Sequence, residues 1–534
     1  MANKKQKKVK IKKVKIMNKK EKHKTSKHVA HEEEKKSSVI EQYKVEVDNA
    51  DVTVKIMKEK GEKIYTLEFP VINIATAALL DDIRQELISA ASVGIGIGQT
   101  LSKEELAKVK KRFIEEASRL LNDIDPGIDK KTVEFLIGKL MQDMLGLGEV
   151  EFLVNDPNLE EIVIPSARET IRAYHKRYGW LKTNLKVATE DAIINYSNIV
   201  ARRVGRQITV LTPLLDAHLI SGDRTNAVLY PISSKGNTIT IRKFARDPYT
   251  IIDLIKNNTV NSEISALLWQ ATEYEMNIIV SGGTASGKTV FLNCCMAFMP
   301  PNHRILSIED TRELMLPDYL YWTPLVTRTP NVEGKGEVSM LDLLINSLRM
   351  RPDRIILGEM RRQSEAEVLF EAMHTGHSVY ATLHADSASE TISRLTNPPI
   401  NVPKNLLSGV NLNVVMTRDR RKGIRRVYQV AEFIVDKDNV SANLLYRYIN
   451  EKDVIESHGE SAKLFEDLSR HTGMSQAEIN ADLKKRKMIL DWMLKNDVLR
   501  IEPVSRIFSL YYSDKERLIK LVEKNAKPAE VLQQ

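Results

Sequence analysis

The sequence of 534 residues has few cysteines and no long apolar run. Its two cysteines, Cys294 and Cys295, are adjacent, which excludes a disulfide framework and a tetracysteine zinc site and is typical of a reducing compartment. The longest charge-free apolar stretches, 70–80 and 87–101, fall short of the roughly 20 residues that span a bilayer. The first lysines lead into no apolar signal segment. We therefore expect a cytoplasmic protein.

Positive charge is concentrated at the start of the chain. Residues 1–28 contain thirteen lysines and one glutamate, a net charge of +12, so the other 506 residues sum to −3. A lysine-rich segment without aromatic residues cannot bury enough apolar surface to offset its ordering entropy. We predict a disordered basic tail over 1–38, which either solubilises the chain or contacts anionic lipid. Nucleic acid ranks lower, because the rest of the chain has no positive excess.

The length predicts two or three domains, and 42% hydrophobic with 28% charged residues is typical of globular cores. Apolar strands alternate with helices over 259–445, which predicts a parallel α/β core. The expected divisions are a basic tail (1–38), a strand-hairpin and helical subdomain (39–144), an α/β domain (145–246), a linker (247–258), the α/β core (259–445) and a helical region (446–534).

Local patterns predict individual elements. Alternating residues over 40–70 predict a hairpin with its turn at 60–62. Capping boxes predict helix starts at Ser102 and Ser475, each with a glutamate three residues later. Other helices are expected over 131–144 and 190–203, and strands over 160–165, 226–232 and 238–244.

The strongest motif is Gly282-Gly-Thr-Ala-Ser-Gly-Lys-Thr289, which matches the P-loop pattern. An apolar strand over 276–280 precedes it and a helix over 289–299 follows it. Glycines let backbone N–H groups turn toward phosphates, and a helix N-terminus favours anions. We expect Lys288 to reach the β- and γ-phosphates and the Thr289 hydroxyl to bind Mg²⁺. The predicted nucleotide-binding residues are Gly282, Gly283, Thr284, Ala285, Ser286, Gly287, Lys288 and Thr289.

Two further apolar segments end in acids. The segment 354–359 reads as a short buried strand that ends at Glu359. Gly358 stands where many P-loop enzymes carry the Mg²⁺-binding aspartate, so Glu359 is expected to act on the metal or on the attacking water. The segment 304–313 reads as a second strand ending in acids. Ligands of parallel sheets lie at the carboxyl ends of strands. This places Glu309, Asp310 and Glu313 near the γ-phosphate.

Three histidines lie in the segment 374–386. Zinc binding by His374, His377 and His384, with Asp386 as the fourth ligand, is disfavoured, because neither a His-x-x-x-His pair nor a cysteine supports it. The apolar run 378–383 predicts a strand, so His384 lies at its carboxyl end. A γ-phosphate sensor, or a group that orients water, is the better interpretation of His384.

The four motifs together resemble the type II/type IV secretion ATPase superfamily, where they are called the Walker A, Asp, Walker B and His boxes. Segments 146–153 and 156–162 are similar to the start of the family's N-terminal domain, and 175–184 looks like the archaeal branch. The absence of a tetracysteine insert argues against the bacterial pilus-extension and type II secretion branches. The C-terminal helices resemble those of archaellum motor and archaeal pilus ATPases.

The resemblance implies a homohexameric ring of two-domain subunits. ATP would bind to a RecA-like core over 259–445, and the N-terminal domain would close over it. Ring motion would pass to a polytopic membrane platform protein that extends or rotates a pilus-like filament, with the ring peripheral at the inner face of the cell membrane. By resemblance, Glu313 or Glu309 would polarise the attacking water, Glu359 would assist Mg²⁺ and His384 would sense hydrolysis.

Rings of this kind also use arginines to neutralise charge in the transition state. The candidates are Arg224 and Arg242. In the strand around Arg242, Thr238 and Thr240 share its polar face, so the arginine can project into a domain or subunit cleft. The alternative for Arg242 is an exposed strand arginine.

Two other functions stay open. A RecA-like DNA translocase or conjugation-type ATPase would need basic or aromatic loops lining a pore, and we expect no arginine-rich loop near the core. An inactive, scaffold-like homologue would show losses in the motifs, and the motifs are intact. A filament-assembly motor is the favoured function.

Overall fold

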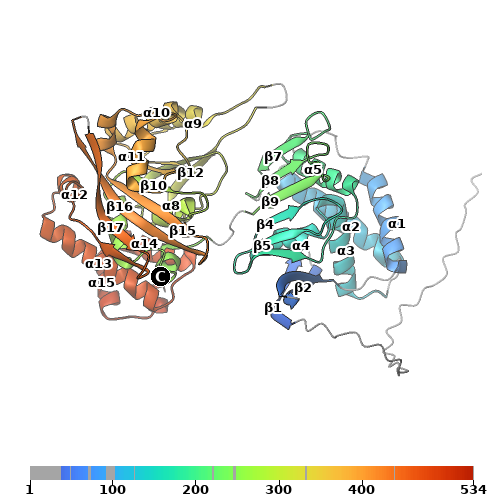
Figure 1. The fold of residues 1–534 in the computed structure, drawn as a ribbon. Coiled ribbons are helices and arrows are strands. Elements are labelled where there is room, and N and C mark those ends of the chain that lie inside the picture. The colour runs from blue at the N-terminus through green and yellow to red at the C-terminus, as the bar shows by residue number, and fades with distance from the viewer. Residues whose placement is uncertain are drawn as a thin grey trace, which may run out of the picture.

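The computed structural model describes residues 38–47, 50–59, 61–69, 74–91, 103–124, 127–218, 222–243, 248–330, 334–437 and 439–532. Within these ranges the strands form two nine-stranded sheets, each in its own unit of the chain (Figure 1). The predicted disordered tail falls almost wholly on residues 1–37, and the predicted cap Ser102 lies in another gap. Both predictions are therefore outside the described residues.

The first sheet has the order β1-β2-β3-β6-β5-β4-β9-β8-β7. Its strands are β1 (Ser38–Val47), β2 (Ala50–Glu59), β3 (Glu62–Glu68), β4 (Leu159–Ile164), β5 (Arg172–His175), β6 (Gly179–Thr183), β7 (Leu214–His218), β8 (Arg224–Val228) and β9 (Thr238–Arg242). The predicted hairpin is confirmed, because Glu59 pairs with Glu62 across a turn that contains Gly61. β3 pairs in parallel with β6. The stretches 39–144 and 145–246, predicted as separate, therefore share one sheet.

Five helices are described in the first unit: α1 (Ile74–Ala91), α2 (Lys103–Ile124), α3 (Lys130–Leu145), α4 (Val150–Asn155) and α5 (Glu190–Arg203). α1, α2 and α3 pack into a small apolar cluster of their own. α5 matches the predicted bounds and is capped by Thr189. The strand predicted over 226–232 is too long, because β8 ends at Val228. Pro231 has no N–H for the ladder, and the N–H of Tyr230 donates to the Asn237 side chain instead.

The second sheet has the order β12-β11-β13-β14-β10-β15-β16-β17-β18. The strands from β12 to β15 in this order are parallel, which confirms the predicted parallel core, and the last three are antiparallel. Their bounds are β10 (Ile278–Gly282), β11 (Arg304–Glu309), β12 (Tyr321–Val326), β13 (Arg354–Leu357), β14 (Ser378–Leu383), β15 (Leu412–Asp419), β16 (Ile424–Asp436), β17 (Asn439–Ile449) and β18 (Val454–Ser457). Because β17 and β18 extend beyond residue 445, the predicted boundary at 445 falls inside the sheet.

Helices cover both faces of this sheet (Figure 1). They are α6 (Ile251–Lys256), α7 (Ser262–Glu273), α8 (Lys288–Met296), α9 (Met340–Ser347), α10 (Gln363–His374), α11 (Ala388–Thr396), α12 (Leu464–Thr472), α13 (Gln476–Lys495), α14 (Ile501–Ser513), α15 (Lys515–Glu523), α16 (Pro528–Leu532) and the short 3₁₀ helices Leu348–Met350 and Lys404–Gly409. The predicted capping box of Ser475 and Glu478 is present. α6 lies inside the predicted linker 247–258, and its apolar side chains are buried in the core of the second unit.

The structure also describes the two cysteines and the apolar helices of the chain. Cys294 and Cys295 are free thiols buried in the core, and burial raises the pKa of both. Both side chains pack in the apolar core of the second unit. Among the helices in the described ranges, none is both long and apolar enough to cross a membrane.

A buried arginine fixes the C-terminal helices to the core. Arg486 of α13 has no exposed surface, and its Nη2 and Nε lie 2.6 Å from carboxylate oxygens of Glu273 and Asp482, respectively. Its guanidinium also lies 5.1 Å from the ring of Trp269. Glu273 ends α7, which leads into β10 and the P-loop. This ion pair therefore anchors the C-terminal helices against the element that precedes the P-loop strand.

We predict that Arg486→Leu lowers the free energy of unfolding by about 3 kcal/mol, because Glu273 loses its buried partner. Lys515, 2.8 Å from Asp482, still neutralises the second acid. Urea unfolding of the full chain measures the loss. The matched control is Lys487→Leu, which removes a half-exposed pair with Asp491 and should cost under about 1 kcal/mol. Equal losses in the two variants would contradict the anchoring role.

Candidate active site

The loop between β10 and α8 has the geometry of a phosphate cradle. Gly282 and Gly287 have φ values of 149° and 93°, which favour glycine. A Cβ on Gly282 would lie 2.5 Å from a carbonyl oxygen of β15, and one on Gly283 would lie 2.6 Å from Asp386 Oδ1. The Ser286 hydroxyl is buried and has no hydrogen-bond partner among the described residues. The loop therefore fits a phosphate group, and the helix after it begins at Lys288 and ends at Met296, three residues before the predicted end.

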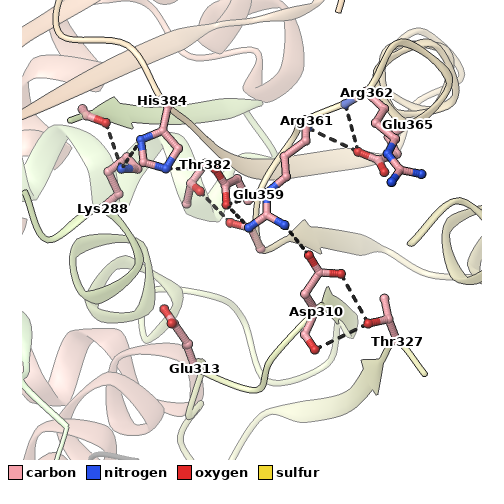
Figure 2. Close-up of polar contacts among 12 residues, drawn as sticks. Lys288, Asp310, Glu313, Thr327, Glu359, Arg361, Arg362, Glu365, Thr382 and His384 are labelled. Atoms are coloured by element: carbon pink, nitrogen blue, oxygen red, sulfur yellow. Dashed lines mark hydrogen bonds and ion pairs between the residues drawn. The ribbon is translucent and has the colours of Figure 1, made fainter. Parts of the chain in front are cut away.

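Lys288 is folded back over this loop. Its Nζ donates to the carbonyl oxygens of Gly282, at 2.8 Å, and Gly283, at 3.0 Å, and lies 3.4 Å from Nδ1 of His384 (Figure 2). The residue is 8% exposed, and burial lowers the pKa of its ammonium group. Thr289 follows in the first turn of α8 and is half-buried. A phosphate in the cradle would give Lys288 an anionic partner in place of two carbonyl groups.

Glu359 and His384 meet beside Lys288, as the positions of their strands predict. His384 Nε2 lies 3.0 Å from Glu359 Oε1, so the neutral tautomer protonated on Nε2 presents its N–H to Glu359 and its Nδ1 lone pair to Lys288. Burial and the nearby Lys288 lower the pKa of His384, which favours that neutral form. β13, β14 and β10 are neighbours in the sheet and deliver all three side chains to one edge.

Glu309 is buried at the end of β11. It is 2% exposed, and its Oε1 accepts from the backbone N–H groups of Glu313, at 2.9 Å, and Leu314, at 3.0 Å. Its Oε2 is buried and has no partner among the described residues. The carboxyl group of Glu309 shapes the turn after β11, so Glu309 is the less accessible of the two acids predicted to polarise water, and which of them does so stays a prediction. Glu313, whose side chain is 40% exposed, is the more accessible candidate for that role.

The two predicted arginines lie at the ends of neighbouring strands in the first sheet and face these acids. Nη2 of Arg242, at the end of β9, lies 3.6 Å from Oε1 of Glu313, which is a contact between the two units of the chain. Arg224 forms a bidentate pair with Asp216, at 3.0 and 2.6 Å. That pair raises the pKa of Arg224, and the more distant Glu313 contributes to the shift. The predicted alternation around Arg242 is also confirmed by burial of Ile239 and Ile241.

Sequence reasoning missed several charged residues at the site. Arg361 contacts Glu359 and Asp310, and Asp386 lies against Gly283. Arg425 Nε donates to the carbonyl oxygen of Ala285, at 3.2 Å. The available signals were the position of Arg361 two residues after the Walker B acid and the position of Asp386 two residues after His384.

An arginine-rich loop was also overlooked. The hairpin between β15 and β16, residues 418–426, has six basic residues and one acid, Asp419. Its tip, residues 420–423, is exposed, and Arg425 places it beside the P-loop. The expectation that no arginine-rich loop lies near the core is therefore wrong.

The other histidines of the motif contact polar groups close to them in the chain or on the neighbouring 3₁₀ helix. His374 Nε2 lies 3.1 Å from the carbonyl oxygen of Leu406, and His377 Nδ1 lies 3.3 Å from the Thr375 hydroxyl. Over the part of the chain that the structure describes, no three His, Cys, Asp or Glu side chains are grouped to hold a metal ion.

Comparisons with known proteins define the class. The family "Type II/IV secretion system protein" matches residues 221–438. A Methanocaldococcus jannaschii protein, "Uncharacterized protein MJ0900", is 35% identical over 384 residues, 70% of this chain and 69% of that protein. A second protein of that archaeon, "Uncharacterized protein MJ0781", is 26% identical and covers 91% of this chain and 90% of its own. "Type IV secretion system protein PtlH" of Bordetella pertussis is 33% identical over 245 residues, 42% of this chain and 72% of PtlH.

The chain belongs to the type II/type IV secretion ATPase superfamily, and its relatives include archaeal proteins. This confirms the resemblance found in the sequence. It also agrees with the topology, in which the P-loop strand β10 lies inside a parallel sheet and β14 separates it from the Walker B strand β13. The fold is a RecA-like core with an α/β N-terminal unit and a helical C-terminal region.

We predict that Glu309 makes stability depend on pH. Burial raises its pKa from 4.5 to about 7, so between these values the folded state holds more protons than the unfolded chain. The free energy of unfolding should therefore fall as the pH rises from about 4.5 to 7, by on the order of 3 kcal/mol from this group. Glu309→Gln keeps an oxygen for both N–H groups and should remove this loss. Urea unfolding at pH 5 and pH 8 tests it; the same pH dependence in Glu309→Gln and wild type would contradict it.

Proposed function

We propose that this protein is a Mg²⁺-dependent ATP hydrolase that acts as a motor subunit. One observation carries the proposal: Lys288, Glu359 and His384 converge beside a glycine cradle at the carboxyl edge of a parallel sheet. Ligands of such sheets bind at this edge. Membership of the secretion ATPase superfamily supports the same reaction.

The proposed roles follow from the placement of each group. Backbone N–H groups of residues 283–288 would bind the phosphates, and Lys288 would exchange its two carbonyl partners for phosphate oxygens. Thr289 and Glu359 would hold Mg²⁺, which when bound neutralises charge on the transferred phosphoryl group. Glu313 would orient the attacking water, because its half-exposed carboxylate extends from the turn that Glu309 shapes. The two residues proposed to hold Mg²⁺ offer a hydroxyl and a carboxylate oxygen, and oxygen ligands are the ones that Mg²⁺ prefers.

His384 is proposed as the sensor of hydrolysis. It contacts both the phosphate-binding lysine and the Walker B acid. A movement of Lys288 or of Glu359 would shift the imidazole ring and so change the contact of His384 with the other residue. The neutral form that its lowered pKa favours can accept and donate at the same time, which a charged ring cannot.

Arg242 and Arg224 are proposed to complete the site from the N-terminal unit. Arg242 already lies against Glu313 within one chain. Arg224 is paired with Asp216 and would have to leave it, or act on a neighbouring subunit. Charge from such arginines matters most in the transition state, where a suitably placed arginine can contribute about 10³-fold or more.

The biological setting is proposed from the family. We infer a homohexameric ring, peripheral at the inner face of the cell membrane, that passes motion to a polytopic membrane platform protein and so assembles or rotates an archaellum or type IV pilus-like filament. The units proposed for this motion are residues 38–243 and 248–532. The lysine-rich tail is proposed to contact anionic lipid.

A second candidate, a DNA translocase or conjugation-type ATPase, has one observation in its favour. The basic hairpin 418–426 lies beside the P-loop, and its exposed arginines Arg420 and Arg421 are in no ion pair within the described residues. A polyanion could bind such a surface. The net charge of −3 outside residues 1–28 argues against it.

We predict that the wild-type chain hydrolyses ATP only with Mg²⁺ and that Lys288→Ala lowers turnover by at least about 100-fold. The lysine charge follows the γ-phosphate into the transition state, so turnover should fall more than nucleotide affinity. Steady-state phosphate release with Mg²⁺ or EDTA measures both effects. Lys452→Ala, at a mostly exposed lysine of another hairpin, is the control and should behave as wild type. Hydrolysis by Lys288→Ala at the wild-type rate would exclude the assigned site.

Adding polyanions to the same assay separates the two candidate functions. The motor function predicts stimulation by vesicles that contain anionic lipid and no stimulation by DNA. Deletion of residues 1–37 should abolish the lipid effect, because that segment carries the lysines. Stimulation by DNA that Arg420→Gln/Arg421→Gln abolishes would instead establish the translocase.

A further inference from the structure

Each carboxylate oxygen of Glu359 has a close nitrogen neighbour in this structure, and Oε2 has two. Its Oε2 accepts from Nε of Arg361, at 2.9 Å, and from Nη2, at 2.5 Å. Its Oε1 lies 3.0 Å from Nε2 of His384. The acid expected to serve Mg²⁺ is therefore already shared between a permanent cation and a histidine (Figure 2).

Arg361 is held between two acids that come from different strands. Its Nη1 lies 2.6 Å from Oδ2 of Asp310, which follows β11, whereas Glu359 follows β13. The backbone N–H of Arg361 donates to Glu365 in the first turn of α10, at 3.2 Å. Figure 2 shows the guanidinium lying between Glu359 and Asp310. Without the guanidinium, no cation would lie between these two negatively charged carboxylates.

We propose that Arg361 is an internal cation that neutralises Glu359 and Asp310 in the nucleotide-free protein and competes with Mg²⁺ for Glu359. The inference rests on the proposed function. A carboxylate oxygen that accepts a bidentate arginine has no lone pair left for a metal ion or a metal-bound water. Mg²⁺, or a water bound to it, can engage Oε2 of Glu359 only after Arg361 releases that oxygen.

The geometry identifies which contact is released. The contact between His384 and Glu359 is the less suitable one to release, because a ring that moves away from Glu359 would also leave Lys288. Arg361 can leave Oε2 and keep Asp310, because a different nitrogen of the guanidinium serves each acid. Thr327, whose hydroxyl lies 3.3 Å from Oδ1 of Asp310, helps to fix that second anchor. Arg361 is thus a positioning residue that sets the apparent affinity for Mg²⁺.

The test is a Mg²⁺ titration of nucleotide binding by the full chain, followed with a fluorescent ADP analogue. Binding is measured first in EDTA and then at rising Mg²⁺. In Arg361→Gln the Mg²⁺ concentration for half-maximal effect should fall about two- to fivefold, the range for losing one partly exposed ion pair. Arg361→Lys keeps the charge but loses the bidentate geometry, so its Mg²⁺ concentration for half-maximal effect should lie between those of wild type and Arg361→Gln. The lysine variant also keeps the test possible if the glutamine variant does not fold.

Arg362→Gln is the matched control. It removes the same charge one residue away, and the Arg362 side chain makes no ion pair with any described residue, so its Mg²⁺ requirement should equal that of wild type. A second readout is the thermal unfolding midpoint without nucleotide, which should fall in Arg361→Gln and be regained with Mg²⁺ and ADP.

An unchanged or increased Mg²⁺ requirement in Arg361→Gln would overturn the competition, as would an equal shift in Arg362→Gln. These outcomes differ from failure of the proposed function, in which the wild-type chain would not bind the ADP analogue at any Mg²⁺ concentration.

Discussion

The parallel alignment of β10, β11, β13 and β14 is the constraint on which the site depends. Each strand runs through the core with its side chains almost wholly buried, so each can end its run of apolar residues only at the same edge of the sheet. The P-loop, the turn carrying Glu313, the acid Glu359 and His384 are the residues that follow these ends. Segments up to a hundred positions apart in the chain are thereby brought within hydrogen-bonding distance.

Charge at that edge is balanced before any ligand binds. Lys288, His384, Glu359, Arg361 and Asp310 form a row in which each side chain lies within 3.4 Å of the next. Glu359 lies between two nitrogen-bearing groups, Asp310 contacts Arg361 and the Thr327 hydroxyl, and the lysine donates to carbonyl groups of its own loop. A nucleotide with its metal ion would therefore exchange partners within an existing network. This arrangement makes the site stable without ligand and sensitive to what occupies it.

Local signals in the sequence were sufficient for much of the fold. The strand β14 and the helix α5 have the predicted bounds, because the signal for each lies within the element itself. The parallel pairing of β3 with β6 was not predicted, since it joins residues more than a hundred positions apart. For the same reason the contacts of Glu309 were not predicted: only the folded turn shows that its carboxyl group faces backbone N–H groups. The hairpin 418–426 was overlooked although its composition is visible in the sequence.

Hydrogen–deuterium exchange with and without Mg²⁺ and ADP tests the central claim most directly, because it reports each strand end separately. If the four ends form one ligand site, protection should increase together in peptides covering 282–290, 309–314, 357–362 and 383–387. The peptide around Arg486, which anchors the C-terminal helices away from this edge, should not change. Protection confined to 282–290, or absent from all four, would contradict the account.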